Sequence, residues 1–192
     1  HLDRLKETLN RISYGKMSGA VGNMASFGEK GIEIQNFIMK ELGLYPSLIA
    51  NQIIQRDRHA EVLFLTAMIG QSLAKVARQF RVLQRNEIAE MFEPFKKTQV
   101  GSSTMPHKRN PIICERICGL ARVVRGNLLA GLENIPLWEE RDISHSSVER
   151  IIIPDSSILV DYMLCKFRGI IENLRVYPQK MRENLEKTKG LI

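Results

Sequence analysis

The chain of 192 residues lacks the features that mark several large classes of protein. Its three cysteines, Cys114, Cys118 and Cys165, form no C-x-x-C pair, so neither a disulfide framework nor a zinc ribbon is indicated. No run approaches the roughly 18 consecutive apolar residues of a membrane-spanning helix. The first residues also lack the basic and then apolar order of a secretory signal. We therefore expect a soluble protein of a reducing cytoplasm.

Aromatic residues are few, at 6%, although the formal net charge is +7. A basic balance is typical of proteins that bind nucleic acid, an anionic membrane surface or a small polyanionic ligand. The lysines and arginines are scattered among acidic residues, no basic run reaches five, and few aromatic side chains are available to stack on bases. The composition favours solvated helix faces with a local anion site, and it leaves nucleic-acid binding open as an alternative.

Apolar residues recur with helical spacing along most of the chain, and no useful run alternates with the period of a strand. The first segment keeps four apolar residues on one face, namely Leu2, Leu5, Leu9 and Ile12. The strongest pattern alternates steps of three and four between Val62 and Leu83. It predicts a long bundle helix from about Asn51 to Glu90, which needs partners along its whole length.

Further helices are predicted on both sides of this one: Glu29 to Leu42, Ile117 to Leu128, Leu159 to Leu174, and a last one that Pro178 opens. The predicted fold class is all-α, a bundle of long helices. We expect residues 1–175 to form the central helical domain and 176–192 to begin a C-terminal helical domain. The first residue lies inside a helical pattern and the last lacks a cap, so we expect a piece of a longer protein.

A polar loop separates two of these helices and contains the run GSSTMPHKRNP at 101–111. Glycine permits an unusual turn, two serine hydroxyls lie beside backbone N–H donors, and Lys108 and Asn110 are suited to hold an anionic oxygen. Rigid scaffolds often carry their chemistry on such loops. The same composition is ordinary for a polar connector, so the residue types alone leave both interpretations open.

This run resembles the signature loop of the fumarase and aspartase superfamily, whose pattern is GSSxMPxKxN. His107 and Arg109 are similar to the adenylosuccinate lyases, whereas fumarases and aspartases have Gly and Val there, and argininosuccinate lyases Gln and Lys. A second run, LWEERDISHSSVER at 137–150, resembles the adenylosuccinate lyase pattern WxERDxSxSSxER, and SGAVG at 18–22 resembles a third loop. The resemblance covers essentially the whole chain and implies the long-helix bundle of that superfamily.

The resemblance also implies roles for individual residues. Ser102 is implied as the general base that removes the Cβ proton of a succinyl group, while Lys108 and Asn110 bind the carboxylate oxygens onto which the charge spreads. The implied substrate-binding residues are Gln52 at the succinyl group, Ser103 and Met105 in the loop, and Arg116, Arg141, Ser146 and Arg150 at the nucleotide. Without the resemblance, the arginines are also open to ordinary surface pairing with Glu115, Glu139 and Asp142.

By this resemblance the full enzyme is a homotetramer that cleaves adenylosuccinate to AMP and fumarate, and also cleaves the succinyl-carboxamide ribotide of purine synthesis. Each active site is shared between subunits, and no cofactor, metal, nucleic acid or membrane is implied. The general-acid histidine of the family lies in a Thr/Ser-rich segment that this chain lacks, so we expect the chain alone to be inactive. The alternatives are another fumarate-releasing lyase, such as argininosuccinate lyase, or a non-enzymatic helical module that binds nucleic acid.

Overall fold

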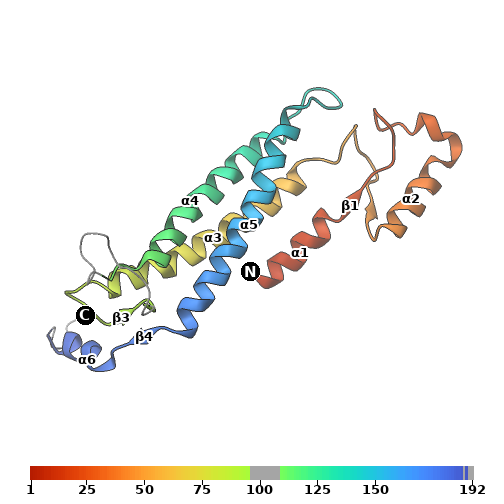
Figure 1. The fold of residues 1–192 in the computed structure, drawn as a ribbon. Helices are drawn as coiled ribbons and strands as arrows, with labels where there is room; N and C mark the ends of the chain where they lie inside the picture. Colours follow the sequence, from red (N-terminus) through yellow and green to blue (C-terminus); the bar gives the residue numbers. More distant parts are fainter. Residues whose placement is uncertain (96–108, 188, 190–192) are drawn as a thin grey trace. The chain divides into compact units, whose positions relative to one another are not determined.

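The computed structural model describes residues 1–95, 109–187 and 189. Helices dominate this part of the chain (Figure 1): α1 (Leu2–Ile12), the 3-10 helix η1 (Ala25–Lys30), α2 (Gly31–Glu41), α3 (Asp57–Leu83), α4 (Ile112–Glu133), α5 (Ser144–Glu172) and α6 (Pro178–Lys187). The strands in it are two residues long. β1 (Tyr14–Gly15) pairs in parallel with β2 (Tyr45–Pro46), and β3 (Met91–Phe92) pairs antiparallel with β4 (Arg175–Val176). The predicted all-α class is confirmed.

The chain forms two compact units, and each unit contains part of the three long helices. Unit 1 comprises residues 1–68 and 124–157, and unit 2 comprises residues 69–123 and 158–192. Unit 1 therefore brings together the start of α3, the end of α4 and the start of α5, and unit 2 brings together the remaining parts of the same helices. Within each unit α4 runs antiparallel to α3 and α5. The predicted domain boundary between 175 and 176 stays a prediction.

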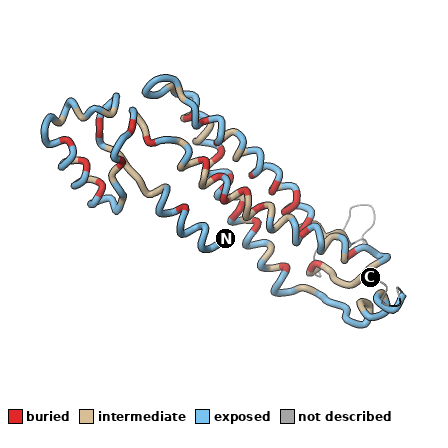
Figure 2. Tube along the Cα trace, turned by 180° about the vertical axis from the view of Figure 1, so that it is seen from behind, coloured by how far each residue is buried: buried red, intermediate tan, exposed pale blue. Residues whose placement is uncertain are grey.

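The core of unit 1 lies where α3, α4 and α5 meet. Leu63 and Ala67 of α3 and Ile152 of α5 are buried there, and Figure 2 shows buried positions recurring along these helices. α4 contributes Gly131, where a Cβ atom would lie 2.3 Å from Leu63 Cδ1. A glycine at this position therefore lets α4 approach the side chain of Leu63 closely.

The core of unit 2 also lies between α3, α4 and α5. Ile117 of α4 and Met163 and Ile170 of α5 are completely buried. The ring of Phe80 on α3 stacks on that of Phe167 on α5, with centroids 6.0 Å apart. Cys114 and Cys118 are also buried, whereas Cys165 is exposed.

Helix α3 is shorter than the sequence pattern predicts, and the predicted bounds near Asn51 and Glu90 are wrong. It spans 27 residues from Asp57 to Leu83, which corresponds to about 40 Å. After Leu83 the chain reverses: Ala89 has a positive φ of 54°, and the N–H of Glu90 donates to the carbonyl of Leu83 at 3.0 Å. The chain then enters β3, whose partner β4 lies far along the sequence, so local periodicity could not predict the helix end.

By length and composition alone, α3 could cross a membrane, because an 18-residue window of it has a mean hydropathy of 1.3. The core helix of a soluble protein passes the same test, and 39% of this window is buried inside the fold.

Helix α5 begins well before the point at which the sequence pattern becomes helical. It starts at Ser144 and contains Pro154, which cannot donate the hydrogen bond expected at its position. Three residues around the proline, Ile152, Ser156 and Val160, are buried at helical spacing. The hydroxyl of Ser156 also accepts a hydrogen bond from the Asn127 amide of α4 at 3.1 Å. Packing against α4 therefore stabilises a helix that the mixed composition of this segment does not predict.

The predictions for α2 and for the start of α6 agree with the structure within two residues. α2 ends at Glu41, just before Gly43, which has the positive φ of 66° that glycine adopts without strain. α6 begins at Pro178, where the missing N–H of proline costs nothing.

Candidate functional site

Four of the predicted site residues, Ser102, Ser103, Met105 and Lys108, lie outside the described residues. The structure does describe the residues on both sides of segment 96–108: Phe95 precedes it, and Arg109 and Asn110, the last part of the signature run with Pro111, follow it. The described residues around segment 96–108 all belong to unit 2.

Asn110, one of the predicted catalytic residues, lines a cleft of about 830 Å³ in unit 2. One wall comes from the C-terminal end of α3 and the turn after it, including Arg78, Arg81 and Arg85. The opposite wall comes from Asn110 and from Glu115 in the first turn of α4. The end of one helix and the beginning of another thus place an amide, a carboxylate and several guanidinium groups around one space.

The charge of this cleft favours an anionic ligand. Four arginines line it, Arg109 being the fourth, against the two carboxylates of Glu87 and Glu115. Arg85 pairs with Glu87 at 3.5 Å, but both side chains are more than half exposed. Solvent screens such a pair, so it reduces the positive potential of the cleft only slightly. Guanidinium groups bind carboxylates and phosphates through paired, charge-assisted hydrogen bonds.

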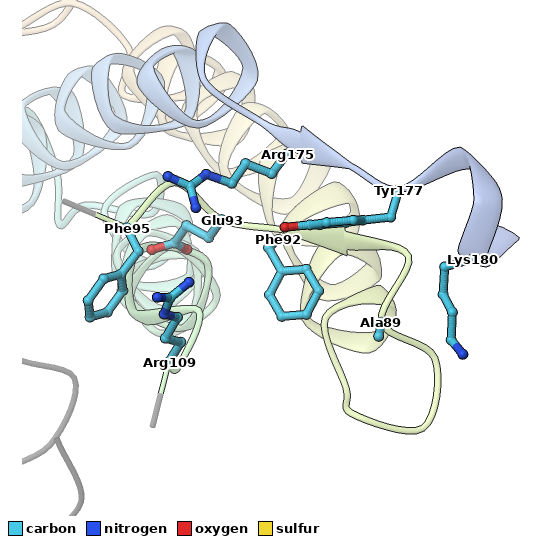
Figure 3. A pocket seen from close by; sticks show the side chains of 8 residues that line it. All are labelled: Ala89, Phe92, Glu93, Phe95, Arg109, Arg175, Tyr177 and Lys180. Carbon is cyan, nitrogen blue, oxygen red and sulfur yellow. The ribbon is translucent and has the colours of Figure 1, made fainter. Parts of the chain in front are cut away.

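A smaller pocket of about 350 Å³ adjoins the cleft and shares Phe92 and Arg109 with it (Figure 3). The guanidinium carbon of Arg109 lies 5.4 Å from the ring centroid of Phe95, within the range of a cation–π contact. On the other side, Tyr177 meets Phe92 edge to face, with centroids 5.5 Å apart. The first of these contacts positions Arg109, a member of the signature run.

Arg116, predicted to bind the nucleotide, is exposed on α4 in the same unit. Its guanidinium donates a hydrogen bond of 2.6 Å to the hydroxyl of Tyr162 on α5. Lys166 lies over the ring of the same tyrosine, 5.4 Å from its centroid. Tyr162 thus holds Arg116 in place, and no sequence motif identified it.

The other predicted substrate-binding residues, Gln52, Arg141, Ser146 and Arg150, belong to unit 1. Gln52 is half-buried next to Asn51, whose amide donates to the carbonyl of Glu139 at 3.3 Å. The segments that carry Gln52 and Arg141 are therefore neighbours. Ser146 and Arg150 lie one turn apart at the start of α5.

Asp142 organises the turn that leads into α5. Its carboxylate accepts hydrogen bonds from the hydroxyl and the N–H of Ser144 and from the N–H of Trp138. These hydrogen bonds lower the pKa of Asp142 to about 2, and the bond from the Ser144 hydroxyl has the largest effect. Within the described residues, the guanidinium groups of Arg141 and Arg150 form no ion pair and no hydrogen bond. The alternative that they pair with Asp142 on the surface is therefore not observed among these residues.

Residues 1–126 match the family model described as Lyase. The chain belongs to the lyase family. It is 51% identical to the adenylosuccinate lyase of Pyrococcus abyssi over all 192 of its residues, and 47% identical to that of Bacillus subtilis. It spans 43% and 44% of the length of these two relatives, and thus less than half of each. The resemblance inferred from the three sequence runs is confirmed.

Two solved structures have the same fold. The 3-carboxy-cis,cis-muconate lactonizing enzyme of Pseudomonas putida superposes with a TM-score of 0.87 at 33% identity, over 98% of this chain and 42% of the other. A fumarate lyase from a Mesorhizobium species superposes with a TM-score of 0.86 at 29% identity, over 98% of this chain and 41% of the other. The long-helix bundle of this lyase family is therefore confirmed for the chain.

Sequence reasoning missed an ion pair beneath the start of α5 in unit 1 of this lyase-family chain. Arg56 and Glu149 meet at 3.1 Å, and both side chains are largely buried. His59 lies nearby, and burial first, followed by the positive charge of Arg56, lowers its pKa. The pair fixes the chain before α3 to the helix that carries Ser146 and Arg150. Its two members are far apart in sequence, so no local signal could have revealed it.

Proposed function

We propose that the full-length protein is an adenylosuccinate lyase, which eliminates fumarate from adenylosuccinate to give AMP and cleaves the succinyl-carboxamide ribotide of purine synthesis in the same way. The observation that carries this proposal is the 51% identity to adenylosuccinate lyases over the whole chain, including the signature loop. The arginine-rich cleft beside Asn110 supports it, because the substrates are polyanions.

In the proposed mechanism, Ser102 removes the proton from Cβ of the succinyl group. A serine is a base only when ionised, so nearby cations and N–H groups must stabilise its alkoxide. The electrons left on Cβ spread into the adjacent carboxylate, whose oxygens Lys108 and Asn110 hold. The C–N bond then breaks, fumarate forms, and a general acid outside this chain protonates the leaving nitrogen. This chain alone is therefore inactive in our proposal.

The remaining substrate contacts follow the same proposal. Gln52 contacts the succinyl group, and Ser103 and Met105 line it from the loop. The nucleotide is held by Arg116, Arg141, Ser146 and Arg150. Free guanidinium groups at Arg141 and Arg150 support this role, because the described residues leave their donors available for phosphate.

We also propose a cytoplasmic homotetramer with active sites shared between subunits. Large apolar side chains that remain exposed on α5 support an assembly through this helix. Ile151 and Ile158 are 63% and 66% exposed and lie one heptad apart, as do Leu164 and Ile171. Such spacing is typical of a helix that packs against another one. The mass of the full-length protein by light scattering tests this assembly.

A substrate panel tests the proposed activity. The full-length protein is incubated separately with adenylosuccinate, argininosuccinate and a carboxymuconate, and each product is identified by chromatography. AMP and fumarate from adenylosuccinate alone are the expected result. Fumarate from argininosuccinate or a lactone from the muconate would replace the proposal with another activity of the family. Salt-dependent binding to random DNA without turnover would favour the nucleic-acid module.

A further inference from the structure

Two nearly buried polar side chains of unit 2, Gln84 and Glu93, lie close to the residues that border segment 96–108. Each is only 7% exposed. Gln84 directly follows α3, and Glu93 lies between β3 and the first residue of the loop segment. Burying a polar group costs free energy unless it is hydrogen-bonded. The hydrogen-bond partners of Gln84 and Glu93 therefore show which parts of the chain these side chains connect.

The carboxylate of Glu93 caps the start of α4. Its Oε1 accepts the N–H of Ile113 at 3.0 Å, and its Oε2 accepts the N–H of Cys114 at 2.9 Å. Helices begin with N–H groups that have no partner within the helix, and a negative charge is stabilised there. Pro111, just before α4, has no side-chain oxygen that could serve as a cap. The burial of Cys114 and the charge of Glu93 raise the pKa of the Cys114 thiol, which keeps it neutral.

The amide of Gln84 connects the two ends of the loop. Its Oε1 accepts the N–H of Glu93 at 2.9 Å, and its Nε2 donates to the carbonyl of Arg109 at 2.9 Å. Gln84 is itself fixed, because its N–H donates to the carbonyl of Phe80 at 3.0 Å. One side chain at the end of α3 therefore holds Glu93, three positions before segment 96–108, and Arg109, directly after it.

We propose that Gln84 and Glu93 are positioning residues for the elimination reaction. Together they fix the described residues on either side of segment 96–108 to α3 and α4, and thereby set where Asn110 is held. This inference rests on the proposed function, in which the loop supplies the base. Figure 3 shows Glu93, Phe95 and Arg109 on the same side of the pocket, with Tyr177 and Lys180 opposite. A simple helix cap would need Glu93 but not the bridge from Gln84 to Arg109.

The test compares three near-isosteric variants of the full-length protein. Glu93→Gln places an NH2 group against an amide donor, and Gln84→Met removes both bonds of the bridge. Gln71→Met is the matched control, because the Gln71 amide also joins α3 to α4, donating to the Ala121 carbonyl at 2.8 Å, but contacts neither end of the loop. We measure kcat, KM and the primary isotope effect on kcat with adenylosuccinate deuterated at Cβ.

We expect kcat to fall roughly ten- to a hundredfold in Glu93→Gln and Gln84→Met, the scale of a reacting group displaced by about 1 Å. KM should change little, and the isotope effect should rise because proton removal becomes more rate-limiting. Gln71→Met should keep kcat and the isotope effect of the unmodified protein. A loss of folded enzyme alone would lower apparent kcat without raising the isotope effect, and would overturn the inference.

Hydrogen exchange separates this inference from the proposed function. In Gln84→Met, we expect faster exchange at the Glu93 N–H and, through it, at the N–H groups of Ile113 and Cys114, whether or not the protein turns over adenylosuccinate. Faster exchange at Glu93 alone would show that the contacts are independent and would overturn the positioning role. Faster exchange at Glu93, Ile113 and Cys114 together, in a protein that releases no fumarate, would support the link between Gln84 and the start of α4 but refute the proposed function.

Discussion

Replacing Gly131 by alanine should destabilise unit 1, although alanine is the better helix former. The added Cβ would lie 2.3 Å from Leu63 Cδ1 and 3.5 Å from Ile152 Cδ1. Carbon atoms pack best at about 3.5–4.0 Å, so the first of these distances is a severe overlap. Leu63 is only 2% exposed and has little space in which to move.

The expected magnitude follows from two opposing effects. Overpacking a core costs about 1–3 kcal/mol, and the helix propensity of alanine over glycine returns about 1 kcal/mol. Gly126→Ala is the control, because Gly126 lies on the same helix in the same unit and its Cβ would meet nothing within 4 Å. Gly131→Ala should therefore be less stable than Gly126→Ala by about 1–3 kcal/mol.

Thermal and urea unfolding of both full-length variants measure this difference. Adding Leu63→Ala removes the overlapping methyl groups, so the double variant should be less destabilised than the sum of the single changes. Equal stability of Gly131→Ala and Gly126→Ala would refute the close approach of α4 to Leu63. Additive effects in the double variant would refute the identity of the clashing side chain.

Three further predictions concern the proposed site and the pH dependence of stability. Ser102→Ala should abolish turnover with little loss of substrate affinity, since a base acts in the transition state; a collapse in Ser103→Ala instead would move the role to the neighbouring hydroxyl. Arg141→Ala and Arg150→Ala should each weaken nucleotide binding by roughly ten- to a hundredfold, or ~1.5–3 kcal/mol, while turnover at saturating substrate persists, as calorimetry and steady-state kinetics will show. The pKa of His59 is lowered in the fold, so its contribution to stability is complete above the ordinary histidine pKa of about 6.5 and declines as pH falls below it. His59→Gln should flatten this decline in a series of unfolding curves, and an unchanged slope would contradict it.

Helix ends that are set by nearby residues in the sequence were predictable. Gly43 and Pro178 mark helix ends through backbone chemistry alone, and both predictions agree with the structure. What could not be predicted depends on partners distant in sequence. The end of α3 is set by strand pairing with β4, and Pro154 is tolerated because residues around it are buried.

The sequence supplied the candidate site residues as motifs, and their roles stay predictions; it could not supply their geometry. The signature loop identified Asn110, and the second run identified Arg141, Ser146 and Arg150. The side chains that support these motifs carry no motif of their own. Tyr162 beneath Arg116 is one case. The bridge from Gln84 to Arg109 is another, because an ordinary glutamine acquires its role only when the chain folds back on itself.

If the full-length protein eliminates fumarate by removing a proton from Cβ, the reverse reaction must add a solvent proton to the same carbon. The protein is incubated with AMP and fumarate in heavy water, and the adenylosuccinate formed by the reverse reaction is analysed by proton NMR. We expect adenylosuccinate carrying one deuterium at Cβ, on a single face, and no product with Ser102→Ala. No adenylosuccinate from the unmodified protein, or adenylosuccinate without deuterium at Cβ, would contradict it.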